Sequence, residues 1–206
     1  MEDSMRLVRE GYNAIANDYL ASRTAESADV RLLDDFLPLL PPGGLVLDAG
    51  CGAGLPVTGI LQQRCRVVGV DFAETQLALA RKLVQDAAFV CQDLTSLAFA
   101  ADCFDAICSY YAIIHIPRQK HGDLLRAFHH ILKPSGLALL CLGANDLSTD
   151  IDDDYFGRPM HWSHYDAERN LKLLESAGLQ VVWSRLVADN GWPDASHLFV
   201  LAQKPS

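Results

Sequence analysis

From residue 45 onward, short apolar runs alternate with segments whose apolar positions recur every three or four residues. The apolar runs are "LVLDA", "RVVGV", "AFVCQ", "FDAICSY" and "GLALLCL", which are typical of buried strands. The segments "LPVTGILQQR" and "AETQLALARKLV" have helical spacing, and a further helix is predicted around residues 118–132. Strands that alternate with helices indicate a parallel sheet with crossover helices, so the pattern predicts an α/β, doubly wound fold.

The pattern also predicts the two ends of the chain. Near the C-terminus, a helix over residues 166–177 ends at Gly178 and precedes the strands "LQVVWSRLV" and "HLFVLAQK". Before the sheet, two apolar stripes indicate two helices: Met5, Val8, Tyr12, Ile15 and Tyr19 for the first, and Val30, Leu33, Leu37 and Leu40 for the second. We expect residues 1–40 to form a helical cap over the open C-terminal edge of the sheet.

Residues 144–165, "ANDLSTDIDDDYFGRPMHWSHY", show neither the alternation typical of a strand nor the spacing typical of a helix. Loops of this length in a compact domain are usually lids or binding loops. We therefore interpret this segment as a lid that contributes to an acceptor site, within a single domain that spans residues 1–206.

Composition and charge narrow the possible functions. The chain has 206 residues, half of them hydrophobic, with no apolar run of about 18 residues and no charged-then-apolar leader, which indicates one soluble cytoplasmic domain and no membrane partner. The net charge of −9 and the lack of a basic run disfavour nucleic acid. The six cysteines form no CxxC pair, so no metal site is predicted.

The stretch "LVLDAGCGAG" places Gly50, Gly52 and Gly54 directly behind the first strand. In an open α/β sheet the first βα turn lies beside the ligand, and glycines let backbone amides approach it. A dinucleotide fingerprint that starts at Gly50 needs a glycine at position 55, where this chain has Leu55. The spacing therefore favours a different nucleoside cofactor.

The pattern D-x-G-x-G-x-G from Asp48 resembles class I S-adenosylmethionine-dependent methyltransferases. Four further stretches match that family in order: "VVGVDFAETQLALAR", "FVCQDL", "FDAICSYYAIIHIPR" and "LKPSGLALL". The resemblance covers most of the chain and implies a Rossmann-like methyltransferase fold with a seven-stranded sheet, and S-adenosylmethionine as the cofactor.

The same resemblance implies roles for individual residues. Asp71 is expected to hold the ribose hydroxyls, Phe72 to pack on adenine, and Asp93 and Leu94 to hydrogen-bond the adenine edge. The other implied cofactor-binding residues are Tyr19, Asp48, Gly50, Cys51, Gly52, Gln76, Ser109 and Tyr110. The alternative for Asp71 and Asp93 is that they cap their own backbone, as loop aspartates commonly do.

The sulfonium methyl group is already activated, so catalysis is expected to consist mainly of positioning. A protonated nucleophile needs a base, and His115 and His161 are the predicted catalytic residues. The predicted substrate-binding residues are Tyr12, Tyr111, Met160, Trp162 and His164. Packing is the alternative for Tyr12 and Tyr19, and helix capping or packing is the alternative for His115. In the stretch "SHYDAE", the alternative is that Ser163 or Asp166 caps the following helix.

The predicted function is methyl transfer from S-adenosylmethionine to a small-molecule acceptor, by a monomer or homodimer. A nucleoside-cofactor binding protein or a nicotinamide-dependent oxidoreductase is the alternative. A nucleic-acid methyltransferase is disfavoured because residues 109–112 read "SYYA" in place of D/N-P-P-Y/F and no Pro-Cys dipeptide is present. The sequence leaves the methylated atom of the acceptor open.

Overall fold

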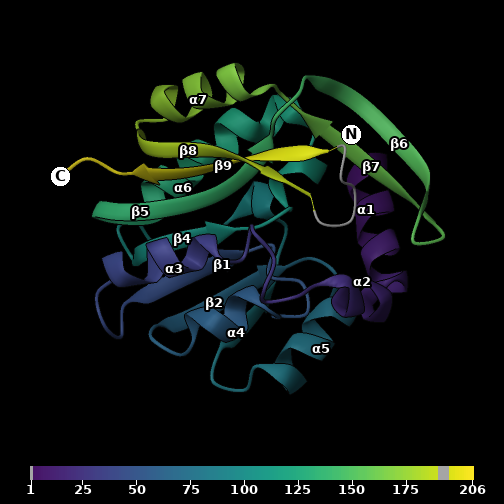
Figure 1. Ribbon diagram of the computed structural model, residues 1–206, viewed down its shortest axis with the longest axis horizontal. Helices are drawn as coiled ribbons and strands as arrows, with labels where there is room; N and C mark the ends of the chain where they lie inside the picture. The colour runs from purple at the N-terminus through teal and green to yellow at the C-terminus, as the bar shows by residue number, and fades with distance from the viewer. Residues whose placement is uncertain (1, 190–194) are drawn as a thin grey trace.

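The computed structural model describes residues 2–189 and 195–206, and its centre is a seven-stranded sheet (Figure 1). The strand order is β3-β2-β1-β4-β5-β9-β8. Strands β1 to β5 are parallel, and β9 runs antiparallel to both β5 and β8. The bounds are β1 Leu45–Ala49, β2 Arg66–Asp71, β3 Ala88–Cys91, β4 Phe104–Ser109, β5 Leu132–Gly143, β8 Gln180–Ala188 and β9 Ser196–Gln203. The predicted seven-stranded α/β fold is confirmed.

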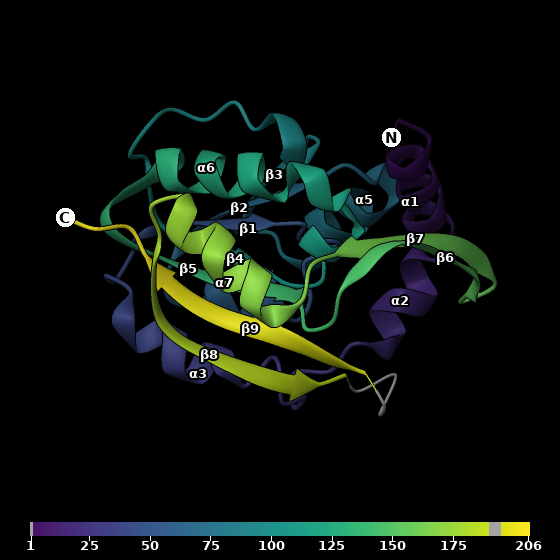
Figure 2. The same cartoon turned by 90° about the horizontal axis from the view of Figure 1, so that it is seen from above.

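Helices cover both faces of this sheet, and Figure 2 shows α3 and α6 on opposite sides of it. One core joins Leu33, Phe36 and Leu61 to the strands, while a second joins Phe128 and Leu174 to the other face. The helices are α3 Leu32–Phe36, α4 Val57–Leu61, α5 Glu74–Leu83, α6 His121–Ile131 and α7 Ala167–Ser176; the 3-10 turns are η1 Leu37–Leu39, η2 Leu94–Ser96, η3 Ile113–His115 and η4 Arg118–Lys120. In the part of the chain described, no helix has the length and apolar character needed to cross a bilayer.

The first predicted N-terminal helix is two helices, α1 Glu2–Ala14 and α2 Ala16–Ser22, which meet at Ile15. Ile15 leaves helical geometry, with φ −98° and ψ 11°. Ile15 is itself buried, so the change of direction occurs at a packed position of the chain. Asn13 anchors α1 by donating to Glu74 (3.1 Å) and accepting from the Thr75 N–H (2.8 Å), both at the start of α5.

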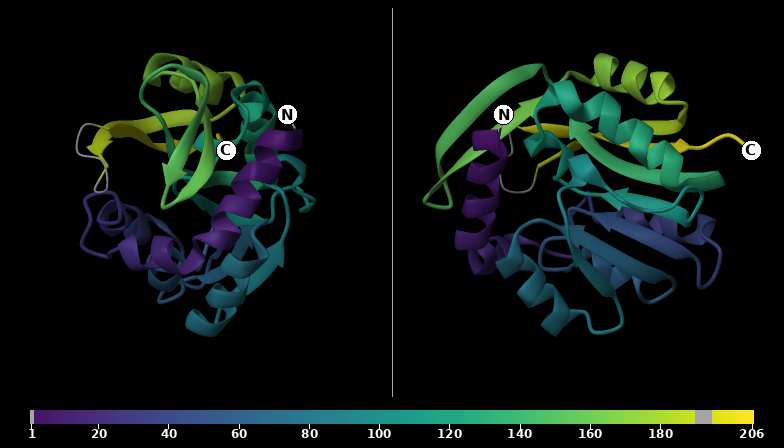
Figure 3. Two further views of the ribbon diagram at one scale, coloured as in Figure 1. Left: turned by 90° about the vertical axis from the view of Figure 1, so that its right-hand side faces the viewer. Right: turned by 180° about the vertical axis from the view of Figure 1, so that it is seen from behind.

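The second predicted helix is shorter than expected, because α3 passes into the 3-10 turn η1, whose second residue is Pro38. Proline lacks the N–H that a longer helix needs there. This element packs its buried Leu33 and Phe36 on a face of the sheet, so the expectation that it covers the C-terminal edge is wrong. Helices α1 and α2 occupy that position (Figure 3).

Residues 144–165 are not the irregular loop that the sequence suggested, because most of them form a β-hairpin of β6 Leu147–Tyr155 and β7 Arg158–His164. The turn residues Phe156 and Gly157 have φ values of 53° and 75°, as type I′ hairpin turns require. The hairpin lies beside α1 (Figures 1 and 3), where Tyr155 and Met160 pack with Val8. The rest of β6 is largely exposed and polar, so it lacks the alternation that predicts a strand.

Candidate active site

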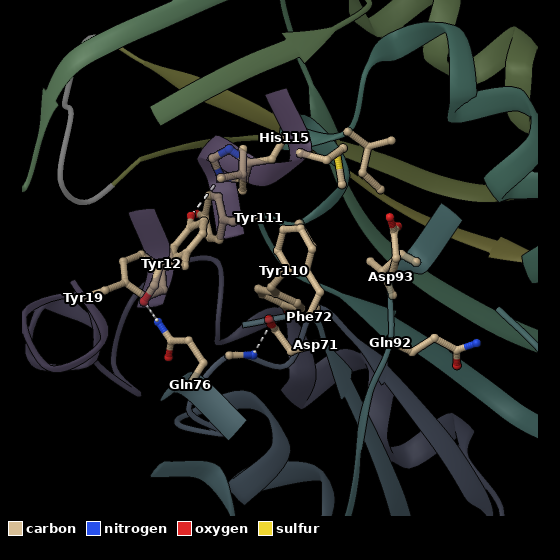
Figure 4. Close-up of a pocket in the computed structure, with 17 residues that line it drawn as sticks. Tyr12, Tyr19, Asp71, Phe72, Gln76, Gln92, Asp93, Tyr110, Tyr111 and His115 are labelled. Atoms are coloured by element: carbon tan, nitrogen blue, oxygen red, sulfur yellow. Dashed lines mark hydrogen bonds between the residues drawn. The ribbon is translucent and has the colours of Figure 1, made fainter. Parts of the chain in front are cut away.

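A pocket lies at the C-terminal ends of β1, β2 and β4 and is closed by α1 and α2 (Figure 4). We call it the inner pocket. Its lining contains most of the residues that the sequence assigned to cofactor or acceptor: Tyr12, Tyr19, Gly50, Gly52, Asp71, Phe72, Gln76, Asp93, Leu94, Tyr110, Tyr111 and His115. The lining also includes Met5, Val8, Gln92, Ala112 and Ile116. Strand ends that are adjacent in the sheet bring these distant segments together.

The turn after β1 needs glycine because another segment of backbone lies against it. Gly50 has φ 82°, and a Cβ at this position would lie 2.1 Å from the Cβ of Ala112, which follows β4. No side chain fits at that distance, so the turn requires glycine, and its backbone lines the pocket directly.

Asp71, the last residue of β2, lies beside this turn. Its carboxylate accepts the N–H of Gly52 (2.9 Å) with one oxygen and the N–H of Ala73 (2.8 Å) with the other. Burial raises the pKa of Asp71, and these backbone hydrogen bonds oppose the rise. A carboxylate oxygen accepts more than one hydrogen bond, so Asp71 can hold the loop and still receive ligand hydroxyls.

Gln76 on α5 and Asp93 after β3 present further acceptors. The Gln76 amide donates to the Tyr12 carbonyl (3.4 Å), while its buried Oε1 has no hydrogen-bond partner among the residues that the structure describes. Oε1 lies beside the Gly52 turn, since a Cβ added at Gly52 would be 3.6 Å from it. A hydrogen-bond donor of a ligand in the pocket would therefore satisfy this buried oxygen. Asp93 accepts the Thr95 N–H (2.7 Å), so it caps η2 and lines the pocket at the same time.

His115 lies behind Tyr12 and is held in one tautomer. Its Nδ1 lies 2.7 Å from the carbonyl oxygen of His161, which can only accept, so Nδ1 carries the hydrogen. Nε2 therefore accepts the Tyr12 hydroxyl hydrogen over 2.8 Å (Figure 4). Burial lowers the pKa of His115 to about 3, so the ring is neutral at pH 7.

A larger cavity of about 800 Å³ opens on the other side of the tyrosines. We call it the outer cavity; it lies between α2, the hairpin and the adjoining ends of β8 and β9. It shares Tyr12, Tyr19 and Tyr111 with the inner pocket, and it also contains the predicted Trp162 and His164. The three shared tyrosines therefore separate two spaces of different character.

Some predicted site residues lie elsewhere. Asp48 and Cys51 line a smaller cavity behind the glycine turn, where burial raises the pKa of Asp48 to about 7 against a hydrogen bond from Thr58. Ser109 is buried and donates to the Ala49 carbonyl (2.8 Å).

Met160 and His161 line neither the inner pocket nor the outer cavity. Met160 packs against α1, and His161 contacts Thr149 (Nε2 to Oγ1, 3.0 Å). The structure does not bring the His161 ring to the pocket; its backbone carbonyl instead orients His115.

Residues that the sequence missed in the inner pocket are mainly apolar. Met5, Val8 and Ile116 read as core positions, because an apolar residue that faces a cofactor has the same sequence pattern as one that faces the core. The docking of α1 brings Met5 and Val8 to the pocket, and Ile116 reaches it at the end of η3.

The strand order, the bare turn and the acidic residues at strand ends together define a Rossmann-like protein with a nucleoside-type pocket. Residues 46–136 match the family model described as a methyltransferase domain. Among solved structures, 1,6-didemethyltoxoflavin-N1-methyltransferase of Burkholderia thailandensis superposes with a TM-score of 0.75 and 21% identity, covering 100% of this chain and 90% of that chain. A methyltransferase of Methanosarcina mazei gives a TM-score of 0.74 at 18% identity, covering 83% of this chain and 97% of that one.

Curated relatives align over shorter stretches. The tRNA (carboxymethyluridine(34)-5-O)-methyltransferase alkbh8 of Xenopus tropicalis is 32% identical over 139 residues, which is 66% of this chain and 21% of that protein. A ubiquinone biosynthesis O-methyltransferase of Pseudomonas paraeruginosa is 31% identical over 103 residues, which is 48% of this chain and 44% of that one. The aligned part is thus less than half the length of these relatives. Residues 46–136 therefore resemble a methyltransferase domain, and the whole chain shares the fold of the solved methyltransferases.

Proposed function

We propose that the protein transfers the methyl group of S-adenosylmethionine, held in the inner pocket, to a small molecule held in the outer cavity. The observation that carries this proposal is the shared wall of Tyr12, Tyr19 and Tyr111 between the two spaces. A donor and an acceptor must meet at near-attack distance with water excluded, and adjoining cavities provide that arrangement.

The residues of the inner pocket suit this cofactor. Asp71 offers carboxylate acceptors for the ribose hydroxyls, and Gln76 offers its buried Oε1 to a donor group of the cofactor. Phe72 and Leu94 supply apolar surface for the adenine ring. When bound, the cofactor supplies a positively charged sulfonium with an activated methyl group, so the protein does not need to create an electrophile.

The Tyr12–His115 pair is placed to hydrogen-bond the group of the acceptor that loses a proton. The Tyr12 hydroxyl hydrogen points to His115, and its oxygen also contacts the Tyr155 side chain. Because a phenolic oxygen has two lone pairs, it can still accept an O–H or N–H of the acceptor. In the overall transfer the bond from sulfur to methyl breaks, the bond from methyl to the nucleophile forms, and a protonated nucleophile releases its proton. Tyr12 and His115 orient the acceptor's O–H or N–H as a hydrogen-bonded pair, and the proton leaves to solvent because the pKa of His115 is lowered to about 3.

Charge bears on the class of acceptor that the protein can bind. The relatives include an enzyme named for tRNA and one named for ubiquinone biosynthesis, and a small molecule is named in the Burkholderia structure. In this chain Asp150, Asp152 and Asp153 line the outer cavity, and the net charge is −9. Both features repel a phosphate backbone, so they support a small-molecule acceptor.

Calorimetry and a turnover assay test the proposal. We expect the purified protein to bind S-adenosylmethionine at one site and to give no heat with NAD. Release of S-adenosylhomocysteine is then followed with a panel of small alcohols, phenols and amines, and separately with bulk tRNA. Binding of NAD in place of S-adenosylmethionine would contradict the cofactor, and release with tRNA alone would contradict the acceptor class.

A further inference from the structure

Aromatic rings from two parts of the chain form one wall of the outer cavity. Tyr12 and Tyr19 come from α1 and α2, while Tyr155 and Phe156 come from the tip of the hairpin. Each of these four rings contacts two of the others. The centroid separations are 5.2 Å for Tyr12–Tyr19, 6.3 Å for Tyr19–Phe156, 5.0 Å for Phe156–Tyr155 and 6.4 Å for Tyr155–Tyr12. Trp162 extends this wall, 5.2 Å from Tyr155.

Carboxylates lie on the hairpin side of the same cavity. Asp150, Asp152 and Asp153 project from β6, and Asp189 contributes a further carboxylate, 3.2 Å from the His197 ring. Aromatic faces with nearby carboxylates are the surroundings in which proteins hold organic cations, because the ring quadrupole and the negative charges attract the same ligand.

The positive charge present in the described lining is already neutralised. Arg23 is the lining residue that carries a permanent positive charge, and its guanidinium forms a 2.7 Å ion pair with Asp29, the two side chains being 16% and 2% exposed. Arg23 lies 4.8 Å from the centroid of the Tyr111 ring. A tyrosine of this cavity thus already accepts a cation on its face, and Arg23 does not neutralise the hairpin carboxylates Asp150, Asp152 and Asp153, because it pairs with Asp29.

We propose that the outer cavity recognises an acceptor that carries an ammonium group, either quaternary or protonated. The ammonium is bound against the rings of Tyr12, Tyr155 and Trp162, with Asp150, Asp152 and Asp153 supplying the opposite charge. This inference rests on the proposed function, in which the same molecule presents its nucleophile to the inner pocket across the shared tyrosines. Transfer to a protonated amine itself requires loss of its proton first, since the nitrogen lone pair forms the new bond to methyl.

Choline and its uncharged isostere 3,3-dimethylbutan-1-ol test the inference, because they share size and shape and differ in charge. Each is titrated calorimetrically into the full chain saturated with S-adenosylhomocysteine. We expect choline to bind at least about fivefold more tightly than the isostere, as a cation over aromatic faces should. Equal affinity would overturn cation recognition.

Two variants locate the site. Asp152→Asn keeps an oxygen that can accept the Asp154 N–H (2.9 Å) and removes only the charge. Tyr155→Leu removes a ring and keeps an apolar side chain. Both are expected to weaken choline binding at least threefold and to leave the affinity for S-adenosylhomocysteine unchanged. Asp154→Asn is the matched control, because Asp154 is on the same strand but outside the lining.

The outcomes separate this inference from the proposed function. No choline binding by a protein that still binds S-adenosylhomocysteine would overturn the inference alone. Loss of choline binding in the Asp154→Asn control as well would overturn the assignment to this cavity. Failure of the wild-type chain to bind S-adenosylhomocysteine would overturn both.

Discussion

At the scale of single residues, several side chains serve the fold and the pocket together. Asp71 and Asp93 each accept backbone N–H groups, which is the ordinary role of a loop aspartate, and each also lines the inner pocket. The two interpretations that the sequence left open are therefore compatible, because a carboxylate has more acceptor positions than its own backbone uses.

Removing the Asp71 carboxylate should weaken cofactor binding. Asp71→Ala is expected to cost about 1–3 kcal/mol of binding free energy, the range for losing hydrogen bonds to a charged group. Calorimetric titration with S-adenosylmethionine measures the change, and Asp71→Asn, which keeps one acceptor oxygen, should lose less. Asp123→Ala, on an exposed site of α6, is the control. An unchanged dissociation constant in Asp71→Ala would remove this residue from the site.

His121 should make the protein acid-sensitive. The ring is buried and its Nε2–H donates to the Ile116 carbonyl (2.9 Å); burial lowers the pKa of His121 to about 4, against the opposing effect of that hydrogen bond. An unfolded histidine has a pKa near 6.5, so between about pH 6.5 and pH 4 the unfolded chain binds a proton that the folded chain does not. Stability is therefore lost as the pH falls through this window.

The variant His121→Phe isolates this effect, because all other titrating groups stay the same. The free energy of unfolding, measured by denaturant titration between pH 7 and pH 4, should fall less steeply in the variant, by up to about 1.4 kcal/mol per pH unit. Parallel pH profiles of wild type and variant would show that His121 does not carry the acid sensitivity.

At the scale of elements, the hairpin differs most from the sequence-based expectation. Its strand β6 has exposed aspartates at successive positions, so the sequence shows neither strand alternation nor helical spacing there. The strand is defined by its pairing with β7. Burial of Tyr155 and Met160 against α1 stabilises an otherwise polar element. The hairpin thus depends on contacts with a helix more than 140 positions earlier in the chain.

Gly157 sets the hairpin turn through backbone conformation alone. Its φ is 75°, and a Cβ there would meet no atom within 4 Å, so Gly157→Ala tests conformation without a clash. We expect a loss of about 1 kcal/mol, as for an L-residue in the left-handed region. Gly122→Ala in α6 is the contrasting control, expected to be neutral or stabilising because its added Cβ has ordinary contacts. Thermal unfolding measures both, and equal effects would contradict the assignment of the loss to the turn.

At the scale of the whole molecule, strand order creates the site. Residues that follow β1, β2, β3 and β4 are far apart in sequence, yet the order β3-β2-β1-β4 places these strand ends side by side. Helices α1 and α2 then close the pocket from above, and the hairpin adds the outer cavity beside them. Part of the net negative charge lies at the outer cavity, because Asp150, Asp152 and Asp153 line it. These carboxylates favour a positively charged acceptor there.

The alternating strands and helices, the glycine turn at Gly50 and the acidic residues that follow the strands could all be predicted from the sequence. These features are local, since spacing and residue type decide them before distant segments meet. Tertiary packing set the break between α1 and α2 at Ile15 and the pairing of residues 147–164 as a hairpin. It also keeps the His161 ring outside the pocket while the His161 carbonyl orients His115. Those outcomes depend on packing between segments that are distant in the chain, for which a single sequence carries no periodic signal.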